Sequence, residues 1–346
     1  MALPASGQIT LNQVNVELGN SGTAQIDMNS SAVRGLFGIA SGEIEMSDGY
    51  GKSNVAWYGS RAIAAGGFTG SRSNTMDYVT IATTGNASDF GDYEWFATGV
   101  SGCSDGSRGL MVGGRLNQTN YTVTLNYFDC DTTGNATDFG DMTEYRGMQA
   151  CVSNGTRAAT GGGNQRSGTY GVLTNRIDYV TIQTTGNAID FGDLTVARQD
   201  LAACSDGSRG VFGGGSSGNT IDYITIATTG NAIDFGDLGV SPNTNAGVSG
   251  GTRGVIAGEY SNAASIYYFD IQTTANASLF GNLSVARSYL AGGDDDSRGV
   301  FMGGLGQSVG RSNIADYITI STTGNATDFG DMTIQANSRG GLGGGS

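Results

Sequence analysis

The chain has 346 residues, with 60 glycines, only 2 prolines and a formal charge of −14, and this composition predicts many short strands joined by tight turns. The acidic balance argues against nucleic-acid and anionic-membrane partners, because the long-range field repels both. The absence of histidine excludes Ser-His-Asp and Cys-His catalysis and the commonest transition-metal ligand.

The N-terminus lacks the basic-then-apolar pattern of a secretory signal, and no apolar run is long enough to span a membrane. No motif calls for a cofactor. We therefore expect a protein that is made in a cytoplasm and that works without a cofactor.

Residues 1–54 carry a small repeat of their own, in which Ser-Gly precedes an isoleucine at Ser6, Ser21 and Ser41. Two short helical runs follow the first two copies, and Asn12 is the expected N-cap of the first. The segment is too small for a substantial independent core, so it is either a cap on the following domain or a docking module. The candidate docking side chains are the apolar residues of the two runs: Leu11, Val14, Val16, Leu18, Val33, Leu36 and Phe37.

The stretches MALPASGQITLNQVNVELG and AVRGLFGIASGEIEMSDGYGKS, within residues 1–53, resemble the N-terminal segment of tail and fibre-type proteins of tailed bacteriophages. The resemblance implies that this segment attaches the chain to other virion proteins of the tail, baseplate or fibre. It also implies a virion location and a displayed domain in residues 55–346.

That second region contains one phrase six times, as TTGNA at Thr83, Thr132, Thr184, Thr228 and Thr322 and as TTANA at Thr273. Each copy follows a β-branched, aromatic run and precedes DFGD or a close variant. A clean repeat, Leu201 to Leu238, divides into four short strands, with TGNA as the turn between the third and fourth. Four strands in about 45 residues are typical of one propeller blade.

The order of Gly214-Gly215, Tyr223, Phe235 to Leu238, and by phase Arg198 or Arg287, resembles a Kelch repeat. The resemblance implies a β-propeller with four antiparallel strands in each blade. It implies no particular chemistry, because such propellers serve binding proteins and a few enzymes alike.

The spacing of the repeats predicts how the ring closes. In the first five copies the last residue of DFGD, or of its variant, lies 16 residues before the arginine of the next Ser-Arg or Thr-Arg pair, and Asp331 of the sixth copy lies 15 residues before the end of the chain. We therefore predict an all-β fold, a six-bladed Kelch-like β-propeller closed by a C-terminal strand, in which residues 337–345 complete a first blade that begins near Tyr58. Closure removes exposed sheet edges. Seven blades is the alternative, because Arg339 produces a seventh partial match.

Several repeated polar residues are assigned to the scaffold. The arginine repeated from Arg61 to Arg298, with an aspartate nearby, suggests ion pairs within or between blades, and a central anion-binding ring of arginines is the alternative. Cys103, Cys151 and Cys204 fall at nearly the same phase, so we expect buried thiols too far apart to form disulfides. Asp-rich pieces such as Asp294 to Asp296 offer ligands for Ca²⁺, but they lack the full alternating ligand spacing of an EF-hand loop.

The repeats differ mainly in the connection between the second and third strands, which ranges from 6 to 14 residues. All these connections project from one face of a propeller, and their planar amides, tyrosines and arginines suit hydrogen bonding and stacking. Drift in length without function is the alternative. The candidate ligand or partner residues are Arg72, Asn74, Asn117, Gln118, Asn120, Tyr121, Asn164, Gln165, Arg166, Tyr170, Arg311 and Asn313.

Our hypothesis is a non-enzymatic structural and adhesion protein of a tailed-phage virion. Residues 1–54 would anchor it, and the propeller loops would bind a host-surface glycan or protein, or a neighbouring virion protein. A glycan-degrading tail enzyme is one alternative, although Glu94, Glu144 and Glu259 form no evident pair of catalytic carboxylates. A purely structural decoration protein is the other.

Overall fold

The structure is a computed structural model that describes residues 10–17, 26–28, 33, 45, 59–167, 170–216, 218–239, 246–259 and 264–344. The chain divides into two compact units, Met1–Ala56 and Trp57–Ser346. Each unit is described by itself below.

The first unit contains helix α1 (Leu11–Glu17). Thr10, not Asn12, caps it: the Gln13 backbone N–H donates to Thr10 Oγ1, while Gln13 Oε1 accepts from the Thr10 N–H at 2.7 Å. This reciprocal capping box could have been found in the spacing of threonine and glutamine.

The predicted docking residues of this unit differ in exposure. Val14 and Val33 are fully buried, whereas Leu11 is 49% exposed. Val16 belongs to α1; its side chain, and all of Leu18, Leu36 and Phe37, lie outside the described residues.

The described part of the second unit is built from six four-stranded antiparallel sheets, with two smaller sheets beside them. This confirms the predicted all-β class and the four short strands of each repeat. We number the four-stranded sheets I to VI. Sheet I contains β29 (Gly340–Gly344), β1 (Arg61–Ala65), β2 (Thr75–Thr80) and β3 (Ser88–Asp92). Sheet II contains β4 (Ser101–Ser104), β5 (Arg108–Val112), β6 (Thr124–Asp129) and β7 (Thr137–Asp141).

The next three sheets follow the same order along the chain. Sheet III contains β9 (Ala150–Ser153), β10 (Arg157–Gly161), β13 (Arg176–Thr181) and β14 (Ile189–Asp193). Sheet IV contains β15 (Ala202–Ser205), β16 (Arg209–Gly213), β17 (Thr220–Thr225) and β18 (Ile233–Asp237). Sheet V contains β19 (Ala246–Gly250), β20 (Arg253–Ala257), β21 (Ser265–Asp270) and β22 (Ser278–Asn282).

Sheet VI contains β23 (Ala291–Asp294), β24 (Arg298–Met302), β27 (Ile314–Thr319) and β28 (Thr327–Asp331). The smaller sheets are formed by the connections between these strands. One contains β11 (Asn164–Ser167) and β12 (Tyr170–Leu173), from the second-to-third connection of sheet III, and β8 (Arg146–Gly147), from the connection between sheets II and III. The other contains β25 (Leu305–Gly306) and β26 (Gly310–Arg311), from the second-to-third connection of sheet VI.

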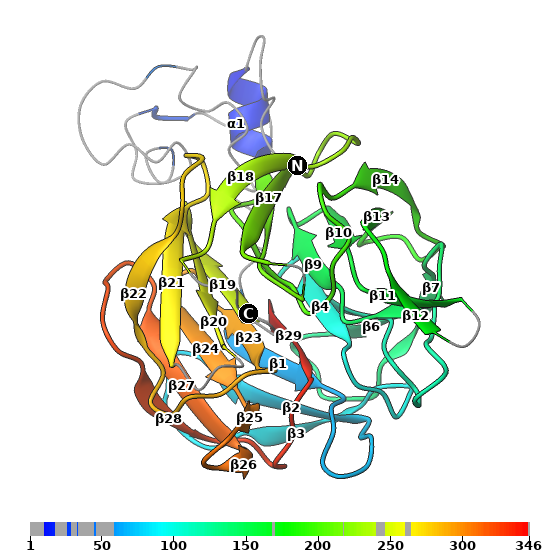
Figure 1. The fold of residues 1–346 in the computed structure, drawn as a ribbon. Helices are drawn as coiled ribbons and strands as arrows, with labels where there is room; N and C mark the ends of the chain where they lie inside the picture. The colour runs from blue at the N-terminus through cyan, green and yellow to red at the C-terminus, as the bar shows by residue number, and fades with distance from the viewer. Residues whose placement is uncertain are drawn as a thin grey trace. The chain divides into compact units, whose positions relative to one another are not determined.

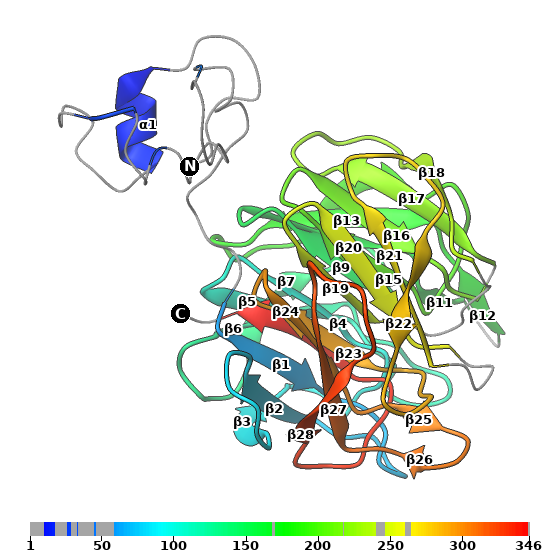
Figure 2. The ribbon, with the colours of Figure 1, turned by 90° about the vertical axis from the view of Figure 1, so that its left-hand side faces the viewer.

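The first strands of the six sheets lie innermost, and the arrangement is propeller-like (Figures 1 and 2). Each first strand contacts the next along the series β4, β9, β15, β19 and β23, and β29 contacts both β23 and β4. β29 also pairs with β1, with Leu342 opposite Ile63. The sheet that contains the first strand of this unit is thus completed by its last.

Hydrophobic cores lie between successive sheets. The phenylalanine of each DFGD copy is buried, and it packs edge-on against the tyrosine of the adjacent third strand; in sheet III, Tyr179 and Phe191 have ring centroids 5.8 Å apart. The same buried cluster includes Phe212 and Ile224 of sheet IV. Because both faces of a sheet pack in this way, the strands read as apolar runs rather than as a strict alternation.

The repeated phrases explain how neighbouring sheets are joined. In sheet III, the Gly186 N–H donates to the Phe139 carbonyl and the Ala188 N–H to the Asp141 carbonyl, both at 2.8 Å. The Asn187 carboxamide oxygen accepts from the Asp141 N–H at 3.0 Å. TTGNA is therefore the predicted turn and also a clamp on the DFGD segment of the preceding sheet.

The asparagine hydrogen bond occurs in all six positions, including the one between sheet I and sheet VI. The acceptor asparagines are Asn86, Asn135, Asn187, Asn231, Asn276 and Asn325. Each such bond contributes about 1 kcal/mol net, so the set ties the sheets together with several kcal/mol.

The glycine of DFGD is required by the close approach of this clamp. Gly91 has φ of +146°, and a Cβ placed there would lie 2.3 Å from the Gly134 carbonyl oxygen. Gly134, in the TTGNA copy that contacts Gly91, has no such need: a Cβ there would meet no atom within 4 Å, and Ala275 stands at this place in sheet V.

Within the described part of the chain, the repeated arginines do not form the expected ion pairs. In all six sheets the guanidinium lies over the tyrosine of the third strand, for example Arg157 over Tyr179 at 4.3 Å and Arg209 over Tyr223 at 4.5 Å. The same group also donates to a backbone carbonyl of the next sheet, as when Arg157 Nη1 of sheet III donates to the Ile226 carbonyl of sheet IV at 3.1 Å. Stacking on an aromatic face and donation to carbonyls satisfy a guanidinium without a carboxylate.

The ion pairs are formed by another set of arginines, in the connections that enter the first strands. They are Arg146–Asp178, Arg198–Asp222, Arg287–Asp316 and Arg339–Asp77, with all partners essentially buried. The match of Arg339 to the repeated Ser-Arg pair is therefore no seventh copy of it, because Arg339 takes the same role as Arg198 and Arg287.

We predict that alanine at these two glycines has very different effects on the free energy of unfolding. Gly91→Ala should destabilise the protein by about 2 kcal/mol or more, because the new methyl group meets the clamp and the backbone has positive φ. Gly134→Ala should change the free energy of unfolding by less than about 0.5 kcal/mol. Denaturant unfolding of both variants checks this, and equal destabilisation would contradict the clamp.

Candidate functional site

One end of the second unit gathers the connections in which the repeats differ. Because the strands are antiparallel, the connections from second to third strands emerge at the same end as those from fourth to first strands. We call this the loop end. The twelve predicted ligand or partner residues belong to its second-to-third connections in sheets I, II, III and VI.

In sheet I, Arg72 is partly exposed and its Nε donates to the Arg115 carbonyl of sheet II at 3.1 Å. Burial lowers the pKa of Arg72, and the neighbouring positive charge of Arg115 lowers it further. The Asn74 carbonyl accepts from the Tyr93 N–H at 2.7 Å. Two guanidinium-bearing loops are thus brought together across the boundary of sheets I and II.

In sheet II, Asn117, Gln118 and Asn120 are exposed. The Asn117 Oδ1 atom accepts from the backbone N–H groups of Thr119 and Asn120, both at 2.8 Å, so it shapes the turn of its own loop. Tyr121 is only 9% exposed, which makes it a structural residue rather than an outward contact.

Tyr121 begins a chain of side-chain hydrogen bonds that crosses three sheets. Its hydroxyl donates to Asn164 Oδ1 at 3.1 Å, and Asn164 Nδ2 donates to Gln199 Oε1 at 2.7 Å. Gln199 Nε2 then donates to Asp200 Oδ2 at 2.8 Å. Burial raises the pKa of Asp200 to about 6. This chain fixes the connections of sheets II, III and IV against one another.

The remaining predicted residues lie to either side. Gln165 is partly exposed in β11; Arg166 and Tyr170 belong to β11 and β12, and their side chains are not among those described. The Arg311 guanidinium lies over the Phe68 ring at 4.7 Å. The Asn313 carbonyl accepts from the Met332 N–H at 2.6 Å.

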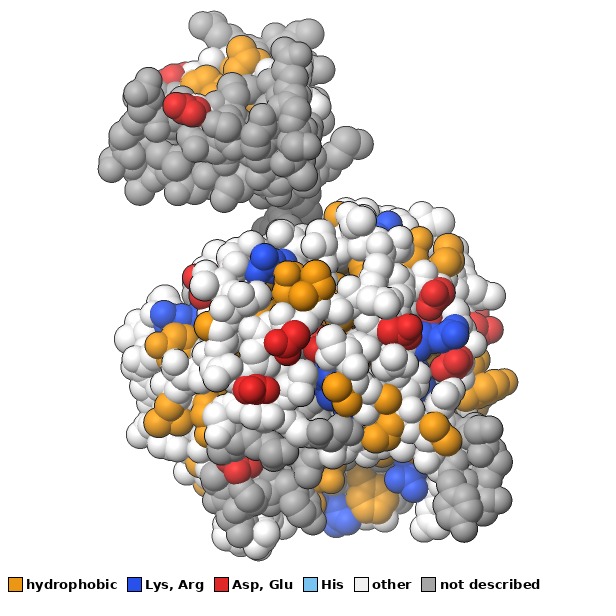
Figure 3. Space-filling view, turned by 45° about the horizontal axis from the view of Figure 1, so that its top comes forward, with side chains coloured by type: hydrophobic (Ala, Val, Ile, Leu, Met, Phe, Trp, Pro, Cys, Tyr) orange, Lys and Arg blue, Asp and Glu red, His pale blue; other side chains and the backbone are white. Residues whose placement is uncertain are grey.

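Sequence reasoning missed the exposed aromatic residues of the loop end. Phe96 is 62% exposed, Tyr145 61% and Trp95 37%, and all three belong to connections from fourth to first strands. The signal was the presence of Trp-Phe and Tyr where other repeats carry valine, alanine or serine. Figure 3 shows hydrophobic, acidic and basic side chains in separate small groups over the visible face of this unit.

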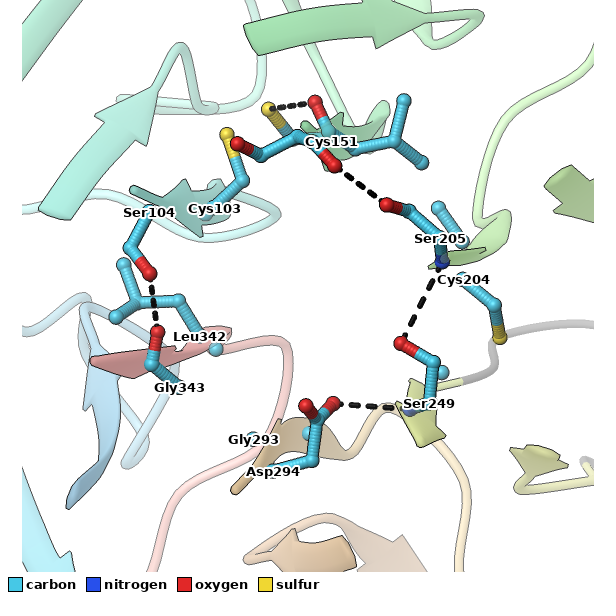
Figure 4. Close-up of a pocket in the computed structure, with 17 residues that line it drawn as sticks. Cys103, Ser104, Cys151, Cys204, Ser205, Ser249, Gly293, Asp294, Leu342 and Gly343 are labelled. Atoms are coloured by element: carbon cyan, nitrogen blue, oxygen red, sulfur yellow. Dashed lines mark hydrogen bonds between the residues drawn. The ribbon is translucent and has the colours of Figure 1, made fainter. Parts of the chain in front are cut away.

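A second candidate region is a cavity lined by the first strands of all six sheets, with a volume of about 530 Å³ that includes open solvent. At the end of the cavity opposite the loop end, side chains form hydrogen bonds with the backbone of the preceding sheet (Figure 4). Ser205 Oγ donates to the Ser153 carbonyl, and Asp294 Oδ2 accepts from the Ser249 N–H at 2.9 Å. Asp294 stands where four other sheets carry serine: Ser104, Ser153, Ser205 and Ser249.

At the loop end of the same strands, backbone bonds link residues of positive φ. Met148 donates its N–H to the Gly99 carbonyl, and Asp200 donates to the Met148 carbonyl at 2.8 Å. In the same series the Gly99 N–H donates to the Ser338 carbonyl, and the Ser338 N–H donates to the Tyr289 carbonyl. The left-handed conformation costs about 1 kcal/mol or more at each non-glycine position, and the inter-sheet bonds compensate for it.

The expectation that the cysteines lie too far apart is wrong for one pair. Cys103 and Cys204 pair with equivalent residues, but Cys151 lies one residue earlier in its strand. A one-residue shift turns a side chain to the opposite face, so Cys151 points back to sheet II and contacts Cys103 (Figure 4). The contact and burial raise the pKa of the Cys103 thiol. All four cysteines are free thiols.

The predicted alternatives for the repeated polar residues are also resolved in part. None of the repeated arginines lines the central cavity. Within the described residues, no group of three or more His, Cys, Asp or Glu side chains is placed to hold a metal ion, and no helix is long and apolar enough to cross a membrane.

No protein-family model matches the sequence, and no match was found among the curated proteins.

The position of Asp294 predicts a pH dependence of stability. Burial raises the pKa of Asp294 to about 7; Asp295 and Asp296 act in the same direction, and the Ser249 N–H acts against them. The folded pKa lies above that of the unfolded chain, near 4. The folded state therefore binds more protons between about pH 4 and 7, and stability falls as pH rises through this window.

Asp294→Ser should remove this loss of stability at higher pH, because serine occupies the equivalent position in four other sheets. We expect the variant to exceed the unaltered protein in stability by at least about 1 kcal/mol at pH 8, with a smaller difference at pH 4.5. Denaturant unfolding at both pH values provides the measurement. A pH-independent difference would rule out an ionised buried carboxylate.

Proposed function

We propose that the six sheets are the blades of a closed six-bladed propeller that serves as a binding module in a tailed-phage virion. The pairing of β29 with β1 and the clamp between Asn86 and Asp331 support closure. The contacts of β29 with both β4 and β23, and a cavity lined by all six first strands, support the same proposal.

The loop end is the proposed binding surface. The observation that carries this is a contrast between constant and variable parts of the repeats. Apolar strands, clamps and stacked arginines recur from sheet to sheet, whereas loop length and the exposed polar or aromatic side chains differ. A surface that varies over a constant scaffold is suited to specific recognition. The ligand would be a host-surface molecule or a neighbouring virion protein.

Anchoring is assigned to residues 1–54. The support is the resemblance of residues 1–53 to the N-terminal segment of phage tail and fibre-type proteins, together with the division of the chain into two compact units. Separate units allow one to be held in the particle while the other binds.

An enzymatic function has less support. Of the acids considered for a glycan-cleaving pair, Glu94 Oε2 accepts from Asn126 Nδ2 at 2.8 Å, and Glu144 lies 3.4 Å from Arg176. Both carboxylates thus have structural partners, in β6 and β13. The release of reducing ends from host polysaccharide would favour the enzyme over a binding module.

Closure predicts a strong dependence on the C-terminal strand. Deleting residues 337–346 removes Leu342, which is 4% exposed, along with the pairing to β1. We expect the melting temperature to fall by about 10 °C or more, since several kcal/mol of packing and hydrogen bonding are lost.

A synthetic peptide of residues 337–346 should restore most of the lost stability by adding as a strand. Deletion of residues 345–346 alone is the control, because β29 ends at Gly344. An unchanged melting temperature in the longer deletion would contradict closure.

For the virion function, we predict that deletion of residues 1–53 prevents incorporation into particles while the second unit stays folded. Quantitative blotting of purified particles measures incorporation, and thermal unfolding checks the fold. Particles that contain the truncated protein at normal levels would refute the anchoring role. Particles with shortened second-to-third loops that still adsorb normally would instead favour a decoration protein.

A further inference from the structure

The cationic residues of the second unit are distributed unevenly. The chain has 17 lysines and arginines. Six are the stacked arginines, four belong to the buried ion pairs, and Arg34 and Lys52 lie in the first unit. The others lie in, or at the end of, second-to-third connections of sheets VI, I, II and III: Arg72, Arg115, Arg166, Arg176 and Arg311.

This placement is informative because the protein carries a formal charge of −14. The corresponding connections of sheets IV and V, residues 214–219 and 258–264, contain no lysine or arginine. Positive charge that the scaffold does not use is therefore confined to one contiguous part of the loop end.

The boundary of sheets I and II presents two guanidinium groups with free hydrogen-bond donors. Arg72 Nε donates to the Arg115 carbonyl, and Arg115 Nε donates to the Asn117 carbonyl at 3.0 Å. Among the described residues, neither guanidinium has an acidic partner, and none of their terminal Nη atoms has a protein acceptor. Two Nη forks held by their Nε atoms are suited to bind a planar carboxylate.

The backbone that carries an exposed aromatic residue is bonded to both of these loops. The connection that carries Trp95 and Phe96 is fixed on one side by the Ala97 N–H, which donates to the Ser73 carbonyl at 3.2 Å. On the other side the Thr98 N–H donates to the Arg115 carbonyl at 3.1 Å. Phe96, at 62% exposure, is thus flanked by the arginine loops.

Arg311 of sheet VI extends this surface. Its guanidinium lies over Phe68, which forms a β-bridge with Arg72. Arg311 Nε is shielded from solvent and has no hydrogen-bond partner. The stacking on Phe68 thus holds a third guanidinium group beside the loop of Arg72.

We propose that Arg72, Arg115, Arg311 and Phe96 form a binding site for an acidic glycan, with carboxylates paired to the guanidinium groups and a sugar ring packed on Phe96. This names the ligand class of the proposed binding surface and rests on that proposal. The carboxylates of an acidic glycan are widely spaced along the chain, so a few arginines can pair with them even though the rest of the protein is acidic. A polyphosphate chain of high charge density would be repelled by the rest of the molecule.

The test uses the full-length protein and oligogalacturonate, with its methyl ester as the uncharged control and poly-glutamate as the acidic control without sugar rings. Calorimetric titration should detect binding of oligogalacturonate that weakens as salt rises. The methyl ester and poly-glutamate should each bind at least tenfold more weakly.

Matched variants then locate the site. Arg72→Gln/Arg115→Gln should weaken binding at least tenfold, and Phe96→Ser should weaken it for the charged sugar. Arg176→Gln is the control, because Arg176 on the same end is already paired with Glu144, and its binding should be unchanged. Thermal unfolding confirms that each variant is folded.

Four results would overturn the inference: no salt-sensitive binding of oligogalacturonate, equal binding of its methyl ester, equal binding of poly-glutamate, or full binding by the double arginine variant. Equal binding of the ester would leave a binding surface at the loop end but no anion site. These outcomes are separate from the failure of virion anchoring, which is measured on particles of the chain without residues 1–53.

Discussion

The clamp between neighbouring sheets is the interaction on which the second unit depends. A four-stranded sheet with two apolar faces cannot bury both by itself, so it is stable only between neighbours. The asparagine of TTGNA binds the backbone of the preceding DFGD segment in all six positions. Because each clamp needs a glycine opposite it, the two phrases are two halves of one contact.

The buried ion pairs show a second constraint: the arginine and the aspartate of a pair are either both present or both replaced. Arg198 and Asp222 are paired without access to solvent. In sheet II the equivalent residues are Ala97 and Asn126, and Asn126 instead donates to Glu94 at 2.8 Å. In sheet V, Tyr267 replaces the aspartate. Since an unpaired buried charge costs several kcal/mol, loss of the aspartate is compatible only with loss of the arginine.

The sequence was sufficient for the strands, the turns and the pairing of the C-terminal segment with β1, because these follow from repeat period and spacing. It was insufficient for the partners of polar residues. The stacked arginines were assigned to ion pairs because an aspartate lay nearby in sequence, yet Arg157 meets Tyr179 and the Ile226 carbonyl. Contacts between sheets depend on which face a residue occupies, and spacing in one repeat does not give the packing of the next.

The same difficulty explains the loop end. Amides and tyrosines indicate recognition by composition, but Tyr121 and Asn164 are held in bonds between sheets. Arg115 was not among the predicted residues, although it directly follows the glycines of its repeat, Gly113 and Gly114. What separates the two sets is whether the donors are already satisfied. An arginine whose Nε atom is already hydrogen-bonded loses less side-chain entropy when its Nη atoms bind a ligand, so the proposed site places ligand contacts at arginines that the scaffold has partly ordered.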